Sequence, residues 1–178
     1  RAMAASEGRV RLLRYSDPSG KDVYSRTVQF MLFLALHILW PKSRTKMHCT
    51  VGDGLLIEVF DAEDFDVNTL KIKLKELITE DFPLIRRRVT TQEAIDHFSA
   101  SGYHDKARLL SFRRETYFDQ YAYGDYAEYF YGELAPSSGY MQVWDLLPAP
   151  GGFMFIYPDS HVPDQVAEYQ ESPNFLNV

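Results

Sequence analysis

The longest apolar segment of the chain runs from Val28 to Trp40, and ten of the eleven residues from Phe30 to Trp40 are apolar. A helix that crosses a membrane needs about 20 such residues. Here His37 interrupts the segment and Pro41 ends it, because the residue before a proline is pushed out of the helical region. We therefore expect one long helix that is apolar on most faces and buried in the protein core, rather than a membrane anchor.

The size and cysteine content limit how the chain can be stabilised. The 178 residues are 46% hydrophobic and 25% charged, which is typical of one globular domain that needs no disulfide or structural metal. The single cysteine, Cys49, excludes an internal disulfide and a multi-cysteine zinc cluster. A lone cysteine fits a reducing compartment, so we expect a cytoplasmic protein with no membrane partner.

Charge is distributed unevenly along the chain. Residues 115–178 hold ten acidic residues and no Lys or Arg, so all 19 basic residues precede them. A phosphate-rich partner could therefore contact only the N-terminal two-thirds. The candidate contacts are a basic cluster that consists of Arg86, Arg87, Arg88, Lys106, Arg108, Arg113 and Arg114. The alternative is that these side chains are solvated and form ion pairs with Asp and Glu.

Helix and strand patterns alternate along the rest of the chain. Residues 47–51 and 55–60, joined by Gly52-Asp53-Gly54, indicate a β-hairpin. A helix with one apolar face is predicted from Val67, Leu70, Leu74, Leu77 and Ile78. Thr90 and Glu93 form a capping box that begins a helix ending near Gly102, and a short helix is expected over 104–112. Further strands are predicted over 10–15, 84–89, 140–144 and 153–157.

This order of elements predicts an α+β fold in which an antiparallel β-sheet packs against the long buried helix and shorter helices. Residues 116–132 are strongly aromatic and contain eight Tyr or Phe. Aromatic side chains can stack on bases, but the charges among them are the acidic Asp119, Asp125 and Glu128. We therefore favour cross-strand packing of these rings over a nucleic-acid platform.

Common catalytic motifs are absent from the sequence. There is no Gly-x-x-x-x-Gly-Lys-Ser/Thr phosphate loop and no Gly-x-Ser-x-Gly turn to present a nucleophile. No two of the five histidines are three or four residues apart, so no helix face offers two imidazoles to one metal ion. His48 and Cys49 are adjacent, and neighbours on a strand point to opposite faces, so we expect them to be structural.

Several segments resemble the editing domain of threonyl-tRNA synthetase over about residues 9–157. They are Arg26–Pro41 (RTVQFMLFLALHILWP), Gly52–Val59, Ile85–Phe98 (IRRRVTTQEAIDHF), Gly132–Pro136 and Tyr140–Leu147. The resemblance implies a fold like the threonyl/alanyl-tRNA synthetase editing domains. A closer resemblance is to the version of this domain in uridine kinase-like proteins, where it lies between a ubiquitin-like domain and a P-loop kinase domain. The strings that carry it are Asp105–Leu110, Gly124–Gly132 and Pro136–Tyr140.

The resemblance also shows what this chain lacks. The synthetase editing site uses a His-x-x-x-His pair and a Cys-x-x-x-His pair. The first pair corresponds to Arg26 and Phe30, and the second to Phe130 and Leu134. None of these side chains is an imidazole or a thiolate, so we expect no catalytic residue and no metal site. Arg26 would suit an anion or a carboxylate, and the alternative is a surface ion pair with Asp22, four residues earlier.

We therefore predict a catalytically degenerate editing-like domain that is a ligand-binding or regulatory module of a uridine or nucleoside kinase-like protein. The alternatives are a metal-free aminoacyl-tRNA deacylase and a purely structural or oligomerisation module. The ligand-binding residues are predicted to be Arg26, Phe30, Arg86, Arg88, Tyr126 and Phe130. The ligand would be a small anion or the acceptor end of a tRNA.

The same interpretation divides the chain into three parts. Residues 1–20 would be a tag remnant and a leading strand or linker, 21–160 the editing-like domain, and 161–178 a linker toward a kinase domain. No cofactor is expected in this fragment, and ATP and Mg would belong to the kinase domain. The expected partners are the adjacent ubiquitin-like and kinase domains. The fragment itself is not expected to be an enzyme, because the editing-site ligands are replaced, whereas the parent protein is expected to be an ATP-dependent uridine or nucleoside kinase.

Overall fold

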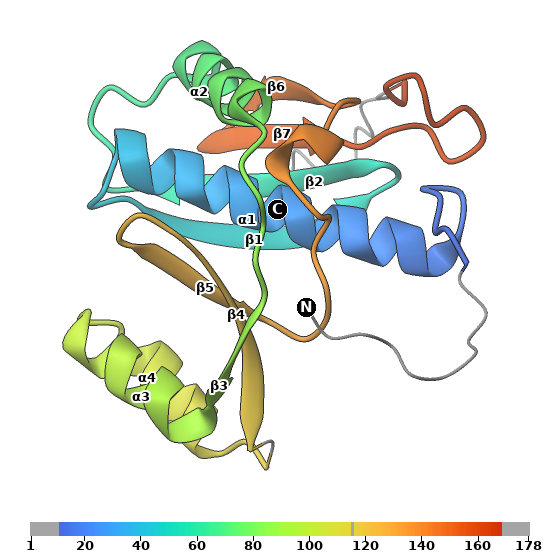
Figure 1. The fold of residues 1–178 in the computed structure, drawn as a ribbon. Helices are drawn as coiled ribbons and strands as arrows, with labels where there is room; N and C mark the ends of the chain where they lie inside the picture. The colour runs from blue at the N-terminus through green and yellow to red at the C-terminus, as the bar shows by residue number, and fades with distance from the viewer. Residues whose placement is uncertain (1–10, 115, 169–178) are drawn as a thin grey trace.

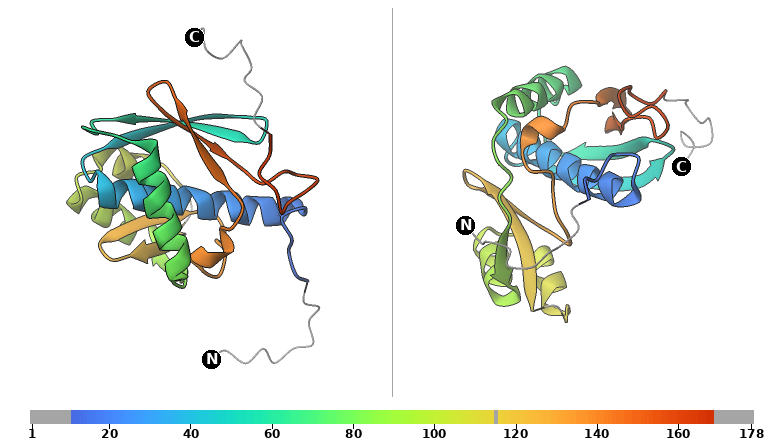
Figure 2. Two further views of the ribbon diagram at one scale, coloured as in Figure 1. Left: turned by 90° about the horizontal axis from the view of Figure 1, so that it is seen from above. Right: turned by 45° about the vertical axis from the view of Figure 1, so that its right-hand side comes forward.

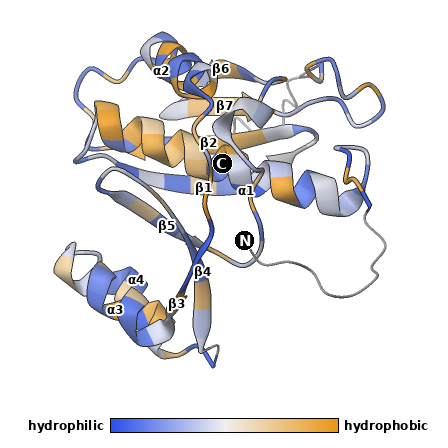
Figure 3. Cartoon of the chain, viewed as in Figure 1, coloured by the Kyte–Doolittle hydropathy of each residue, from blue (hydrophilic) through white to orange (hydrophobic). Residues whose placement is uncertain are grey.

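The computed structural model describes residues 11–114 and 116–168. Its longest element is the helix α1 (Pro18–Leu39), which begins with a proline at its first position and ends one residue before Trp40 and Pro41. Nine of its residues are buried, and hydrophobic residues gather toward its C-terminal half (Figure 3). The predicted buried helix is therefore confirmed. No helix in the described ranges is long and apolar enough to cross a membrane.

A four-stranded antiparallel sheet lies against α1 in the strand order β1-β2-β7-β6. Its strands are β1 (Arg44–Val51), β2 (Gly54–Phe60), β6 (Asp145–Ala149) and β7 (Gly152–Ile156). The predicted hairpin is β1 and β2, and its turn contains Gly52 at φ +59°. One face of the sheet, with Leu55, Ile57, Phe153 and Phe155, joins α1 in the main core. Figure 1 and Figure 2 show α1 running along this sheet.

The helix α2 (Val67–Glu80) packs against α1 through the five apolar residues that predicted it. Asp66 caps its N-terminus by accepting a hydrogen bond from the Thr69 N–H at 2.7 Å. At its C-terminus Asp81 adopts the left-handed conformation with φ +50°. A short 3₁₀ turn, η1 (Ser138–Tyr140), lies against this end of α2.

A second, three-stranded antiparallel sheet has the order β3-β4-β5. It consists of β3 (Arg87–Thr90), β4 (Tyr117–Tyr123) and β5 (Tyr126–Phe130), and the helices α3 (Thr91–Ala100) and α4 (His104–Ser111) pack beside it. We call residues 87–114 and 116–131 the second lobe. Its helices α3 and α4 lie away from α1 (Figure 1), whereas β5 contacts α1. The capping box of Thr90 and Glu93 is present, and both helices lie where the sequence predicted them.

The aromatic residues of the second lobe pack against one another. Phe118 contacts Tyr131 with ring centroids 5.4 Å apart, and Phe98 contacts Tyr129 at 4.8 Å. Cross-strand and helix-to-sheet packing therefore accounts for these rings, as expected. The lobe has its own small core, made of Val89, Ala94 and Phe118.

Three strand predictions were wrong in whole or in part. Residues 11–14 form no strand, because Arg14 turns back to hydrogen-bond Asp17 before α1, and Val10 lies outside the described residues. Only the end of the segment predicted over 84–89 belongs to β3. Residues 140–144 form no strand, because η1 is held to α2 by bonds from Ser138 Oγ to the Leu77 carbonyl (2.8 Å) and from the Gly139 N–H to Asp81 (3.0 Å). The sheet contains β6 instead.

Candidate functional site

The four positions that correspond to the editing-site ligands, Arg26, Phe30, Phe130 and Leu134, converge in the structure. The rings of Phe30 on α1 and Phe130 on β5 have centroids 6.4 Å apart. Both belong to the main core together with Leu134. The Arg26 Nε donates a hydrogen bond to the carbonyl of Glu133, the residue before Leu134, at 3.0 Å. The fold therefore brings together residues that are more than 100 positions apart in the sequence.

Aromatic rings fill the space beneath this point. Phe30 has no exposed surface, and its ring lies 5.7 Å from Tyr126 and 6.5 Å from Tyr121. Burial raises the pKa of Tyr126 well above its ordinary value, with a smaller contribution from the Glu128 carboxylate. Of the predicted ligand-binding residues, Phe30, Tyr126 and Phe130 therefore form the floor of the site.

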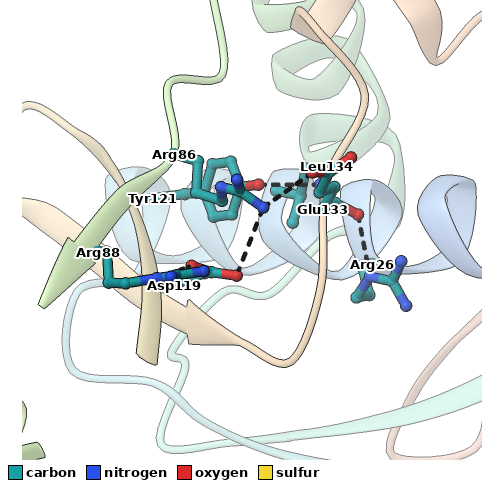
Figure 4. Close-up of polar contacts among 7 residues, drawn as sticks. All are labelled: Arg26, Arg86, Arg88, Asp119, Tyr121, Glu133 and Leu134. Atoms are coloured by element: carbon teal, nitrogen blue, oxygen red, sulfur yellow. Dashed lines mark hydrogen bonds and ion pairs between the residues drawn. The ribbon is translucent and has the colours of Figure 1, made fainter. Parts of the chain in front are cut away.

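A short segment between β5 and η1, residues 132–135, covers this floor, and we call it the strap. Three consecutive residues of the strap are held by side chains from other elements. Arg26 binds the Glu133 carbonyl, Tyr121 Oη accepts the Leu134 N–H at 3.1 Å, and Thr27 Oγ1 accepts the Ala135 N–H at 2.8 Å. Figure 4 shows Arg26 and Tyr121 on the two sides of the strap. Sequence reasoning missed Thr27 and Tyr121, since nothing in their local patterns indicates a partner more than ten residues away.

Gly132 begins the strap and lets it approach α1. Its φ is +133°, a conformation that side chains disfavour, and a Cβ at this position would lie 3.0 Å from the Arg26 Cζ. The guanidinium of Arg26 therefore occupies the space that a side chain at residue 132 would take. This packing fixes Arg26 beside the strap.

The predicted basic residues Arg86 and Arg88 lie next to the strap but are paired with acids of the C-terminal third. Arg86 Nη1 lies 2.8 Å from Glu133 Oε1 and 3.8 Å from Asp119 Oδ2. Arg88 Nε lies 3.6 Å from Asp119 Oδ1. The Asp119 side chain is only 14% exposed, and its Oδ1 is buried without a hydrogen-bond partner in the part of the chain that is described. Figure 4 shows this arrangement of two arginines around one carboxylate.

Arg26 differs from these two arginines. Within residues 11–114 and 116–168, no carboxylate oxygen lies within 4.0 Å of its guanidinium, so the ion pair expected with Asp22 is not formed. Its Nε is used by the Glu133 carbonyl. No carboxylate of the described residues pairs with its terminal nitrogens. Arg26 and Arg86 thus meet at Glu133, and Arg88 is joined to them only through Asp119.

The residues at this site do not fit a metal ion. Guanidinium, phenyl and isobutyl groups offer no lone pair that a divalent transition metal would accept. No group of three or more His, Cys, Asp or Glu that could hold a metal is found among the described residues. The chemistry that this geometry supports is recognition of negative charge beside a closed aromatic floor.

No protein-family model matches the chain. The curated relatives that it matches are threonine–tRNA ligases. It is 26% identical over 153 residues to the enzyme of Carboxydothermus hydrogenoformans. This alignment covers 84% of this chain and 24% of that protein. It is 22% identical over 153 residues to the enzyme of Syntrophomonas wolfei, covering 83% of this chain and 24% of that protein.

A third relative, from Paraburkholderia xenovorans, is 24% identical over 141 residues, covering 77% of this chain and 22% of that enzyme. The chain therefore spans about a quarter of the length of the relatives it matches. Together with the α+β architecture of antiparallel sheets and four helices, these similarities support a module like the editing domain of threonyl-tRNA synthetase.

Proposed function

We propose that this chain is an editing-like domain without hydrolytic activity, which binds a small anionic ligand at Arg26 and acts as a regulatory module of a uridine or nucleoside kinase-like protein. One observation carries the proposal. The four side chains that converge at the editing-site positions are a guanidinium, two phenyl rings and an aliphatic group. A site of this composition lacks a general base or a metal-bound water to attack an ester.

The charge at the site supports an anion as the ligand. Arg26 is held at a fixed place by the strap and by Gly132, and no carboxylate within the described ranges neutralises it. A guanidinium in this state can donate two parallel hydrogen bonds to a carboxylate or a phosphate. Arg86 lies on the other side of Glu133 and could add a second cation if its ion pair rearranged.

The kinase context is the part of the proposal that goes furthest beyond the comparisons. It is supported by the strings 105–110, 124–132 and 136–140, which resemble the kinase-associated version of the domain. Sequencing the parent gene beyond Val178 tests it, and a Gly-x-x-x-x-Gly-Lys-Ser/Thr motif is the expected result. ATP and Mg would bind there, and this domain would respond to its own ligand.

Calorimetry on the 178-residue chain tests the binding site. The ligands are inorganic phosphate, threonine, uridine, uridine monophosphate and an RNA hairpin with the tRNA acceptor end. We expect heat from at least one anion, and at least tenfold weaker binding after Arg26→Ala, which corresponds to about 1.4 kcal/mol. Lys42→Ala is the control, because Lys42 is exposed between α1 and β1, lies outside the predicted basic cluster and has no carboxylate within 4.0 Å among described residues. Absence of heat from every ligand, or equal losses in both variants, would refute the site.

A deacylation assay on threonine-specific tRNA charged with serine tests the loss of activity. We expect the rate with the chain to equal the rate in buffer, since the floor of the site is closed by Phe30 and Phe130. Turnover above that rate that also depends on Arg26 would identify a metal-free deacylase instead. Because this assay and the calorimetry measure different properties, each part of the proposal can fail separately.

A further inference from the structure

A groove of about 300 Å³ lies in the second lobe, between α4 and the three-stranded sheet. One wall is formed by Lys106, Leu109, Leu110 and Arg113, which share one side of α4 and its following turn because their spacing is i, i+3, i+4 and i+7. The opposite wall is formed by Phe118, Tyr129 and Tyr131. None of the six predicted ligand-binding residues lines this groove.

Large apolar side chains at the rim of the groove are exposed to solvent. Leu109 and Tyr131 at its rim are 67% and 57% exposed, and Phe112 beside it is 76% exposed. Beneath the groove, the described residues include one small cluster of buried hydrophobic residues, Val89, Ala94 and Phe118, and Phe98 and Ala107 of the lobe are also buried. Large apolar side chains that gather on one exposed face are typical of a surface that another molecule covers.

Two cationic residues, Lys106 and Arg113, line this apolar surface. Lys106 is neutralised by Glu128 at 2.7 Å. In contrast, Arg113 has no carboxylate within 4.0 Å in the ranges that the structure describes. The guanidinium of Arg113 lies 5.4 Å from the centre of the Tyr131 ring. The groove therefore combines an apolar interior with one cation, Arg113, that no carboxylate of the described residues neutralises.

We infer that this groove is a docking site for an acidic amphipathic peptide segment of a partner protein. The peptide inserts an aliphatic or aromatic side chain between Leu109 and Tyr131 and places a carboxylate against Arg113. The volume is at the lower end of the range for small-molecule sites, which fits one inserted side chain. Binding of an amphipathic helix in an apolar groove is a common mode of peptide recognition.

RNA is the competing occupant, because it also carries negative charge and can stack on tyrosine. The lining favours a peptide. Leu109, Leu110 and Phe118 contribute much of the wall, and these apolar side chains offer no hydrogen bond to a base edge or a phosphate. Arg113 already lies over the Tyr131 ring.

Fluorescence anisotropy with the 178-residue chain tests this inference. The probe is a labelled helical peptide with leucines at i, i+3, i+4 and i+7 and glutamates elsewhere. The comparison probes are the same peptide with lysines in place of glutamates, and a single-stranded RNA oligonucleotide. We expect only the glutamate peptide to bind, and Leu109→Asp to weaken it about tenfold or more. Arg113→Glu should weaken it at least about threefold.

Two matched controls separate the groove from general effects of the substitutions. Ile72→Asp changes a residue that is 60% exposed on α2, and Lys42→Glu reverses an exposed charge that does not line the groove. Both should leave the affinity within about twofold of the unsubstituted chain. Circular dichroism checks that each variant is folded. The inference is overturned if the glutamate peptide does not bind, if RNA alone binds, or if Ile72→Asp weakens binding as much as Leu109→Asp. None of these results depends on Arg26, so this test and that of the anion site fail independently.

Discussion

Replacing Thr27 by valine tests the physical account of the strap most directly. Thr27 has no exposed surface, and its Oγ1 accepts the Ala135 N–H at 2.8 Å. Valine has nearly the same shape but no acceptor, so the Ala135 N–H would be buried without a partner. An unpaired buried donor costs about 1–3 kcal/mol. We therefore expect Thr27→Val to lower the free energy of unfolding by about 2 kcal/mol.

Thr27→Ser is the matched control for this substitution. Serine keeps the hydroxyl and removes one buried methyl group, which costs about 1 kcal/mol. Thr27→Ala removes both and should cost about 3 kcal/mol if the two effects add. Stability is measured by urea denaturation, where the midpoint should fall and the slope should stay unchanged. For a domain of this size, a loss of about 2 kcal/mol corresponds to a fall in Tm of roughly 4–8 °C.

The relative stabilities of the three Thr27 variants show whether the hydroxyl holds the strap. If Thr27→Ser destabilises more than Thr27→Val, the hydroxyl does not hold the strap, and packing alone explains the burial of Thr27. Valine with wild-type stability would mean that the Ala135 N–H finds another partner. Either result would also weaken the argument that Arg26 is fixed by the strap.

Three further predictions concern the strap and the second lobe. Gly132→Ala should lower the free energy of unfolding by about 1–2 kcal/mol because of its positive φ. It should also weaken anion binding as Arg26→Ala does. Gly124→Ala, at φ +58° with no heavy atom within 4 Å of the added Cβ, should leave anion binding unchanged. Thr90→Ala should cost about 1 kcal/mol by removing the capping box of α3, and faster amide exchange should appear first in α3; uniform exchange across the chain would contradict this. The hydrogen bond from the Thr90 N–H lowers the pKa of Glu93 below its ordinary 4.5. The ionised Glu93 carboxylate therefore stabilises the fold fully above this ordinary pKa, and the stabilisation is lost as the pH falls through the lowered pKa. Tm should therefore stay level from about pH 7 to about pH 5 and fall below about pH 4; a rise in Tm below pH 4 would show that this contribution is absent.

The main helices and the first hairpin were predicted from the sequence alone, because their patterns are local. The apolar segment that ends at Pro41 determined α1, and the Thr90–Glu93 pair determined the start of α3. In each case the pattern repeats with the period of the element or lies within one turn. A short stretch of chain therefore contains the whole pattern.

The predictions that failed depended on distant partners. Residues 140–144 have the composition of a strand, but the structure bonds η1 to the end of α2 instead. The alternative for Arg26 was an ion pair with Asp22, four residues earlier, but its Nε binds the Glu133 carbonyl, 107 residues away. The sequence also gave no reason to connect Arg86 and Arg88 through Asp119.

The sequence by itself determined the apolar faces of α1 and α2 and where the helices form, because periodicity is a property of the chain. Its resemblance to the editing domain implied which ligand positions hold other side chains. Only the tertiary structure decided that Thr27, Tyr121 and Arg26 hold three consecutive residues of the strap. Polar pairing of this kind requires atoms within about 3 Å, and that distance depends on how whole helices and strands pack rather than on any local pattern.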